Sequence, residues 1–112
     1  MKVLVCGGRN FSDYQAVDAV LCALPVEPSL IIHGGARGAD RLAKQWAIAN
    51  GIHHCAVPAL WDYYQRSAGM LRNKAMMLLQ PDYGVAFPGG SGTAGMVRLL
   101  IEAGVPVWQP FP

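Results

Sequence analysis

Residues 2–9 read KVLVCGGR, and a similar pattern returns as LIIHGGARG at residues 30–38 and YGVAFPGGSGT at residues 83–93. In each stretch a short apolar run, typical of a strand buried on both faces, leads into a pair of glycines. A helical pattern of apolar residues follows each glycine pair. A strand, a glycine-rich turn and a helix form the repeating unit of a parallel α/β sheet, so these stretches decide the fold class.

The rest of the chain gives a strand-helix unit repeated four times and a closing strand. Strands are predicted at Lys2–Cys6, Leu30–His33, about His54–Val57, Tyr83–Phe87 and Val105–Trp108. Consecutive strands joined by helices lie parallel, with right-handed crossovers. We therefore predict an α/β fold, a single Rossmann-like doubly wound parallel five-stranded sheet in the order 3-2-1-4-5 with about four helices.

Local signals mark the helix ends. Ser12 and Gln15 stand at capping-box spacing before the first helical pattern, which Pro25 stops. The second helix ends at Asn50-Gly51, the third covers about Met70–Leu79, and the fourth runs from Thr93 to Gly104. Residues 58–69 are predicted to form a long loop.

Length and composition limit the classes of protein that the chain can represent. Its 112 residues predict one domain over residues 1–112, and 53% hydrophobic against 14% charged residues suits a buried sheet and hints at oligomerisation. No apolar run is long enough to span a bilayer, and the start breaks at glycine too early for a signal peptide. We expect a cytoplasmic protein without membrane contact.

Three cysteines at positions 6, 22 and 55 fit neither a disulfide framework nor a zinc site. We expect buried thiols and no metal site.

The glycine-rich loops predict a ligand site. Loops that follow parallel strands emerge together at the carboxyl edge of the sheet, and glycine lets the backbone approach a ligand there. Helix N-termini add unpaired N–H groups, and arginine binds phosphate through two parallel hydrogen bonds. The predicted phosphate-binding residues are Gly7, Gly8, Arg9, Gly34, Gly35, Arg37, Gly38, Arg72, Gly89, Gly90, Ser91, Gly92 and Thr93. Each glycine pair alone can also be a simple tight turn.

Two further side chains belong to the predicted ligand site, each with a structural alternative. Asp40 either accepts from a ribose hydroxyl or caps its own helix. Trp61 lies in the long loop, where it either stacks on a base or packs the loop down. His33 is interpreted as a hydrogen-bonded structural histidine.

Standard nucleotide motifs do not match. Gly90, Gly92 and Gly95 spell G-x-G-x-x-G after the fourth strand instead of the first, and no P-loop motif occurs. A dinucleotide dehydrogenase and a P-loop ATPase are therefore disfavoured.

Four ordered motifs resemble one family. GGRNFSD, HGGARGADRLA, WDYYQRSAGMLRNKAM and FPGGSGTAGMVR are similar to the YspA-like, cpYpsA-related branch of the SLOG superfamily, which also holds the Lonely Guy phosphoribohydrolases and the DNA-processing protein DprA. The resemblance implies a Rossmann-like fold, a nucleotide or nucleotide-derived ligand and a homodimer. Arg72 matches an arginine of the Lonely Guy enzymes, and Asn73 stands where they carry lysine.

The chain departs from the family at acidic positions. Lonely Guy enzymes carry PGGxGTxxE, whose glutamate serves cleavage of the base–ribose bond, whereas Met96 stands at that position here. A thioether can neither carry a proton nor stabilise positive charge as a carboxylate does. Leu60 replaces an aspartate of the YspA-like pattern, which leaves Asp62 and Asp40 as candidate catalytic residues.

Three functions remain open. A sensor or binding module for a nucleotide-derived ligand needs no missing residue and no cofactor. A hydrolase of the N-glycosidic bond needs Asp62 or Asp40 in place of glutamate, which leaves open whether the chain is an enzyme. DNA binding is disfavoured, because a net charge of +2 is small and six other cations are scattered along the sequence: Lys2, Arg41, Lys44, Arg66, Lys74 and Arg98.

Overall fold

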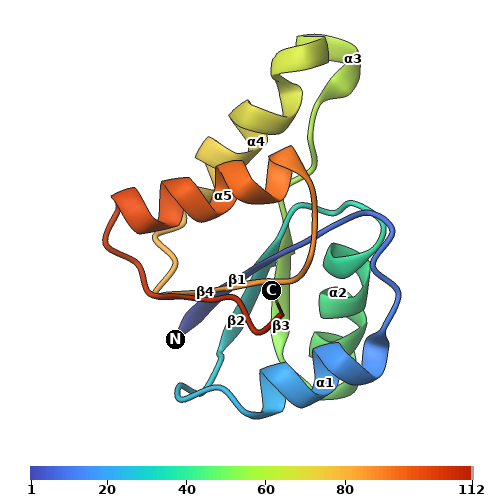
Figure 1. Ribbon diagram of the computed structural model, residues 1–112, viewed down its shortest axis with the longest axis vertical. Coiled ribbons are helices and arrows are strands. Elements are labelled where there is room, and N and C mark those ends of the chain that lie inside the picture. The colour runs from blue at the N-terminus through green and yellow to red at the C-terminus, as the bar shows by residue number, and fades with distance from the viewer. Residues whose placement is uncertain (112) are drawn as a thin grey trace.

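The computed structural model describes residues 1–111 and shows a five-stranded parallel sheet (Figure 1). The strands are β1 (Lys2–Cys6), β2 (Leu30–His33), β3 (His53–Ala56), β4 (Tyr83–Ala86) and β5 (Val107–Trp108). Their order is β3-β2-β1-β4-β5, as predicted, and each neighbouring pair is parallel. The predicted fold class is therefore confirmed. β1 and β2 have the predicted bounds, and the ends of β3, β4 and β5 differ by one or two residues.

Four helices of nine or more residues cover the two faces of the sheet. They are α1 (Tyr14–Cys22), α2 (Ala39–Ala49), α4 (Ala68–Met77) and α5 (Ser91–Glu102). In Figure 1, α1 and α2 lie on one side of the sheet and α4 and α5 on the other. No helix within residues 1–111 has the length and apolar character that crossing a membrane requires.

The alternation of side chains along β1 builds two cores. Val3 and Val5 join α1 and α2 in one buried cluster, whereas Leu4 and Cys6 join α4 and α5 in the other. Successive residues of a strand point to opposite faces, so a continuous apolar run is needed to bury both faces.

The predicted loop over residues 58–69 is wrong. This segment forms α3 (Trp61–Tyr64) and a 3₁₀ turn (Gln65–Ser67), and α4 already begins at Ala68 instead of residue 70. The segment projects away from the sheet in Figure 1, and Tyr63 remains 81% exposed. Four helical residues without a buried apolar side leave no periodic signal in the sequence.

Two helix starts also differ from the prediction. Asp13, and not Ser12, caps α1, because its side chain accepts a hydrogen bond from the Ala16 N–H at 3.0 Å. Helix α5 begins at Ser91 instead of Thr93, with Gly90 as its N-cap and no side-chain cap. The second difference places the glycines of PGGSGT at and inside the helix start.

The prediction that all three cysteines are buried was wrong. Cys6 is buried, Cys55 is half-buried and Cys22 is exposed.

Candidate functional site

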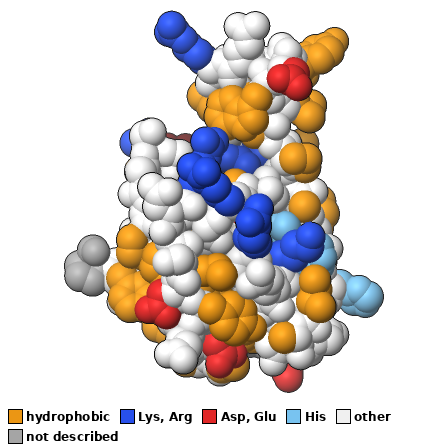
Figure 2. Space-filling view, turned by 90° about the vertical axis from the view of Figure 1, so that its right-hand side faces the viewer, with side chains coloured by type: hydrophobic (Ala, Val, Ile, Leu, Met, Phe, Trp, Pro, Cys, Tyr) orange, Lys and Arg blue, Asp and Glu red, His pale blue; other side chains and the backbone are white. Residues whose placement is uncertain are grey.

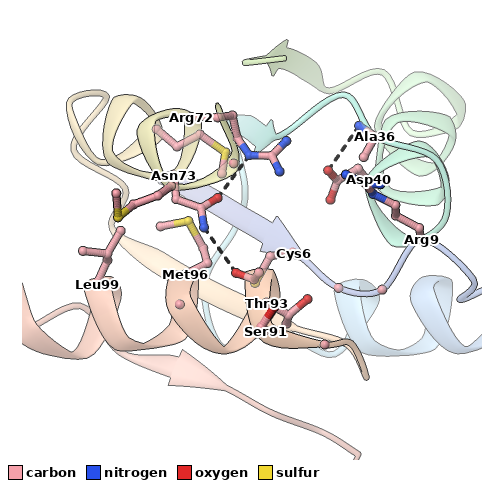
Figure 3. A pocket seen from close by; sticks show the side chains of 18 of the residues that line it. Cys6, Arg9, Ala36, Asp40, Arg72, Asn73, Ser91, Thr93, Met96 and Leu99 are labelled. Carbon is pink, nitrogen blue, oxygen red and sulfur yellow. Dashed lines mark hydrogen bonds between the residues drawn. The ribbon is translucent and has the colours of Figure 1, made fainter. Parts of the chain in front are cut away.

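A cavity of about 700 Å³ opens at the carboxyl edge of the sheet, between the loop after β1 and the facing helices α4 and α5 (Figure 3). Eleven of the predicted ligand-binding residues line it: Gly7, Gly8, Arg9, Asp40, Trp61, Arg72, Asn73, Gly90, Ser91, Gly92 and Thr93. The topology thus brings together residues from opposite ends of the chain, as expected for loops that follow parallel strands.

Helix α5 presents its N-terminus to this cavity. The first N–H groups of a helix have no partner within the helix, and here no side chain caps them. A β-carbon added at Gly90 or Gly92 would have no neighbour within 4 Å, so the surface around these residues is open. The helix dipole favours an anion at this end.

The loop after β1 packs backbone to backbone against the loop after β4. The Gly8 N–H donates to the carbonyl oxygen of Pro88 at 2.8 Å. A β-carbon at Gly89 would come within 2.7 Å of the Gly8 nitrogen and would also collide with the Thr93 hydroxyl. Gly89 therefore permits the close approach of these two loops.

The remaining predicted residues do not line the cavity: Gly34, Gly35, Arg37, Gly38, Gly89 and Asp62. The N–H groups of Gly34 and Ala36 donate to Asp40 Oδ2 at 3.1 and 3.3 Å. Gly38 has a φ of +81°, and a β-carbon there would collide with the carbonyl oxygen of Gly8. Contacts with Asp40 and with the loop after β1 thus hold this loop in place. Its part in ligand binding stays a prediction.

Arg72 and Asn73 connect the elements around the cavity (Figure 3). Arg72 donates from Nη1 to the Gly34 carbonyl oxygen at 3.0 Å and from Nε to Asn73 Oδ1 at 3.1 Å. Asn73 Nδ2 in turn donates to the Gly92 carbonyl oxygen at 3.2 Å. Burial lowers the pKa of Arg72, whereas the nearby Asp40 carboxylate raises it. The guanidinium stays charged, as it does in proteins generally.

Asp40 supports the loop that precedes it. Its exposed fraction is only 7%, and burial raises the pKa of its carboxyl group against the opposing hydrogen bonds and arginines. Because Oδ2 accepts two backbone N–H groups, this oxygen organises the turn after β2. Asp40 is the sole carboxylate among the residues that line the cavity.

Met96, which stands where the Lonely Guy motif has its glutamate, lies in the cavity wall. Met96 lines the cavity and has an exposed fraction of 1%, so a thioether occupies the place where the enzymes resembled carry a carboxylate. Asp62 is exposed on α3 and does not line the cavity.

Five of the nine Lys and Arg residues line the cavity: Arg9, Arg66, Arg72, Lys74 and Arg98. Figure 2 shows Lys and Arg side chains gathered across the middle of one face, below the projecting α3 segment. Arg66, Lys74 and Arg98 are scattered along the sequence, but the fold brings all three into the wall of one cavity. Arg66 belongs to the 3₁₀ turn before α4, Lys74 lies on α4 four residues after Met70, and Arg98 lies on α5 seven residues after Ser91. These elements meet only in the folded protein, where α4 packs on α5.

Trp61 and Arg9 meet at the cavity. The Arg9 guanidinium carbon lies 5.2 Å from the centre of the Trp61 ring, a cation–π contact. Trp61 belongs to α3 and Arg9 to the loop after β1, so this contact ties the projecting segment to the sheet.

Two buried groups near the site are inert. Burial raises the pKa of the Cys6 thiol to about 12, which removes its nucleophilic form at neutral pH. Burial also lowers the pKa of His33 to about 4, and its Nδ1 accepts from the Gly35 N–H at 3.1 Å. His33 is thus a hydrogen-bonded structural residue, as its position at the end of β2 suggested.

Comparisons with known proteins agree with the motifs. The chain is 35% identical over 120 aligned residues to the Gene 61 protein of Mycobacterium phage D29, an alignment that covers 95% of this chain and 93% of that protein. No solved structure matches the chain significantly. Residues 1–64 match the model of one family, so the chain belongs to the YspA, cpYpsA-related SLOG family.

Proposed function

We propose that the chain binds the phosphate of a nucleotide or nucleotide-derived ligand in this cavity and acts as a binding or sensing module. The observation that carries the proposal is the charge of the cavity wall, where five cations face one carboxylate. One oxygen of that carboxylate already accepts two backbone N–H groups. The wall is therefore suited to an anionic ligand, and a cavity of about 700 Å³ has the size of a typical small-molecule site.

The phosphate fits best at the start of α5. Uncapped N–H groups and the positive end of the helix dipole favour an anion there, and the Thr93 hydroxyl offers a further donor. Arg9 and Arg72 stand on the opposite side of the cavity, as Figure 3 shows. Trp61 also lines the cavity, and the part of its ring that Arg9 does not cover offers an aromatic surface for a base.

Membership of the SLOG family supports a nucleotide-related ligand, and the lining favours binding over cleavage. Hydrolysis of an N-glycosidic bond needs a carboxylate close to the bond that breaks. Met96 removes the group that performs this task in the Lonely Guy motif, whereas the surfaces that would hold phosphate need no missing residue.

The substitution Gly90→Asp tests the phosphate position. Because a β-carbon at Gly90 meets nothing within 4 Å, the fold should tolerate the change, while the new carboxylate repels an anion at the helix start. We expect the parent to gain thermal stability with at least one ligand of a panel of nucleoside monophosphates, ADP-ribose and NAD.

The Gly90→Asp variant should lose this gain. Ala19→Asp is the matched control, because Ala19 is exposed on α1 and lies outside the cavity wall. A Gly90→Asp variant that keeps the parent's response would refute the proposed position.

A second candidate function is hydrolysis at the ribosyl bond with Asp40 as the acid. The raised pKa of this buried carboxyl group is typical of general acids and is the observation that favours it. Release of free base from nucleoside monophosphates, lost in Asp40→Asn, would establish this activity. Binding of a nucleotide without release of its base would exclude hydrolysis and support the binding or sensing module.

We also propose the homodimer that the family resemblance implies. Leu60, Tyr63 and Tyr64 are 55%, 81% and 45% exposed on or beside α3, and such apolar groups are common in subunit interfaces. Light scattering after size exclusion would give the mass in solution.

A further inference from the structure

The groove between α4 and α5 continues the cavity away from the start of α5. On α5 the cavity wall includes Ser91, Gly95 and Arg98, which are spaced four and three residues apart and share one face of the helix. On α4 it includes Met70 and Lys74, again four residues apart. Helices α4 and α5 pack against each other, and each contributes a cation to the cavity wall.

Gly95 forms the floor of this groove. A glycine inside a helix costs about 1 kcal/mol relative to alanine, so its presence needs a reason. Packing does not supply one, because the nearest atom to an added β-carbon would be Asn73 Nδ2 at 3.9 Å, an ordinary contact. The absent side chain leaves space on the α5 surface beside Lys74 and Arg98.

Lys74 and Arg98 line the same cavity as the start of α5. Arg98 lies seven residues after Ser91, about 10 Å along the helix axis. Helical side chains lean toward the N-terminus of their helix, so the Arg98 side chain extends back toward the proposed phosphate. A second phosphoryl group bonded to the first would enter the space above Gly95.

We propose that Lys74 and Arg98 form a second anion subsite above Gly95, which takes the second phosphoryl group of a nucleoside diphosphate or pyrophosphate-bridged nucleotide. This inference rests on the proposed function, since the first phosphate fixes the ligand at α5. Asp40, the one carboxylate of the wall, belongs to α2 across the cavity, and its Oδ2 is bound to the loop after β2. The subsite therefore offers two cations without an acidic residue from α4 or α5 in the wall.

Calorimetric titration of the full chain with the mono- and diphosphates of adenosine, guanosine, cytidine and uridine tests the subsite. For at least one base, we expect the diphosphate to bind about tenfold more tightly than the monophosphate, as one added charge-assisted contact would give. In Arg98→Gln this ratio should fall toward one. Pyrophosphate and ADP-ribose, titrated in parallel, distinguish a terminal diphosphate from a bridging one.

Two further variants control for structure and for general charge. Arg41→Gln removes an exposed cation of α2 that does not line the cavity, and the diphosphate preference should persist. Gly95→Leu introduces a good helix former and fills the groove, so it should remove the preference without loss of helix.

The outcomes separate the two proposals. Equal affinities for mono- and diphosphates in the parent, or a preference unchanged in both Arg98→Gln and Gly95→Leu, would overturn the second subsite and leave the proposed function intact. Absence of binding by all eight nucleotides, pyrophosphate and ADP-ribose at millimolar concentrations would overturn the proposed function itself.

Discussion

Replacement of Gly95 by alanine should stabilise the ligand-free protein. The residue lies inside α5, four residues after the first helical position, where alanine is favoured over glycine by about 0.8–1.0 kcal/mol. The added methyl group would lie 3.9 Å from Asn73 Nδ2, so no steric cost offsets this gain. At about 4–8 °C per kcal/mol for a domain near this size, the melting temperature should rise by several degrees.

Urea unfolding followed by far-UV circular dichroism measures this effect at fixed pH. Gly38→Ala is the matched comparison, because φ is +81° there and a β-carbon would lie 2.6 Å from the backbone of Arg9. That variant should lose at least about 1 kcal/mol of unfolding free energy. Loss of stability in Gly95→Ala by more than about 0.5 kcal/mol would show that packing requires the glycine. Ligand binding would then not be the reason for a glycine at this position.

Two other predictions concern the stability of the fold. Because burial lowers the pKa of His33 to about 4, well below its ordinary 6.5, the unfolded chain takes up the proton first as pH falls. The His33 contribution to the free energy of unfolding should be complete above about pH 6.5 and be lost between about pH 6.5 and 4. An NMR titration of the His33 ring with its midpoint near 6.5 would contradict this. Asp13→Ala should cost about 1 kcal/mol, because Asp13 accepts from the Ala16 N–H, whereas Ser12→Ala should change urea stability by less than about 0.5 kcal/mol. Equal losses in both variants would restore the capping box that the sequence suggested.

The parallel sheet could be predicted because local patterns determine its strands and the connections between them. The order 3-2-1-4-5 comes from the common Rossmann-like arrangement, since the same alternation also permits other orders. Continuous apolar runs mark strands buried on both faces, and β1 indeed contributes Val3 and Val5 to one core and Leu4 and Cys6 to the other. Alternation with helices then requires parallel strands and right-handed crossovers. The same topology predicted that the loops of Gly7 and Gly90 would meet, and both line the cavity.

The α3 segment could not be predicted, because no local pattern specifies it. Trp61–Tyr64 is a single helical turn with no buried residue, so it has neither amphipathic periodicity nor a strong stop signal. Its position depends on contacts with distant residues, such as the Arg9 guanidinium over the Trp61 ring.

The sequence by itself determined the strands, their parallel arrangement and the edge where the glycine-rich loops meet, since hydrophobic periodicity and glycine placement are local properties. Only the tertiary structure decided which residues form the cavity wall. It tied the loop of Gly34 and Gly38 to Asp40 and to the loop after β1, and it placed Lys74 of α4 and Arg98 of α5 in one cavity wall. The physical reason is that the electrostatic potential in a cavity is the sum over all charged side chains that are close in space. Separation along the sequence does not determine which side chains these are.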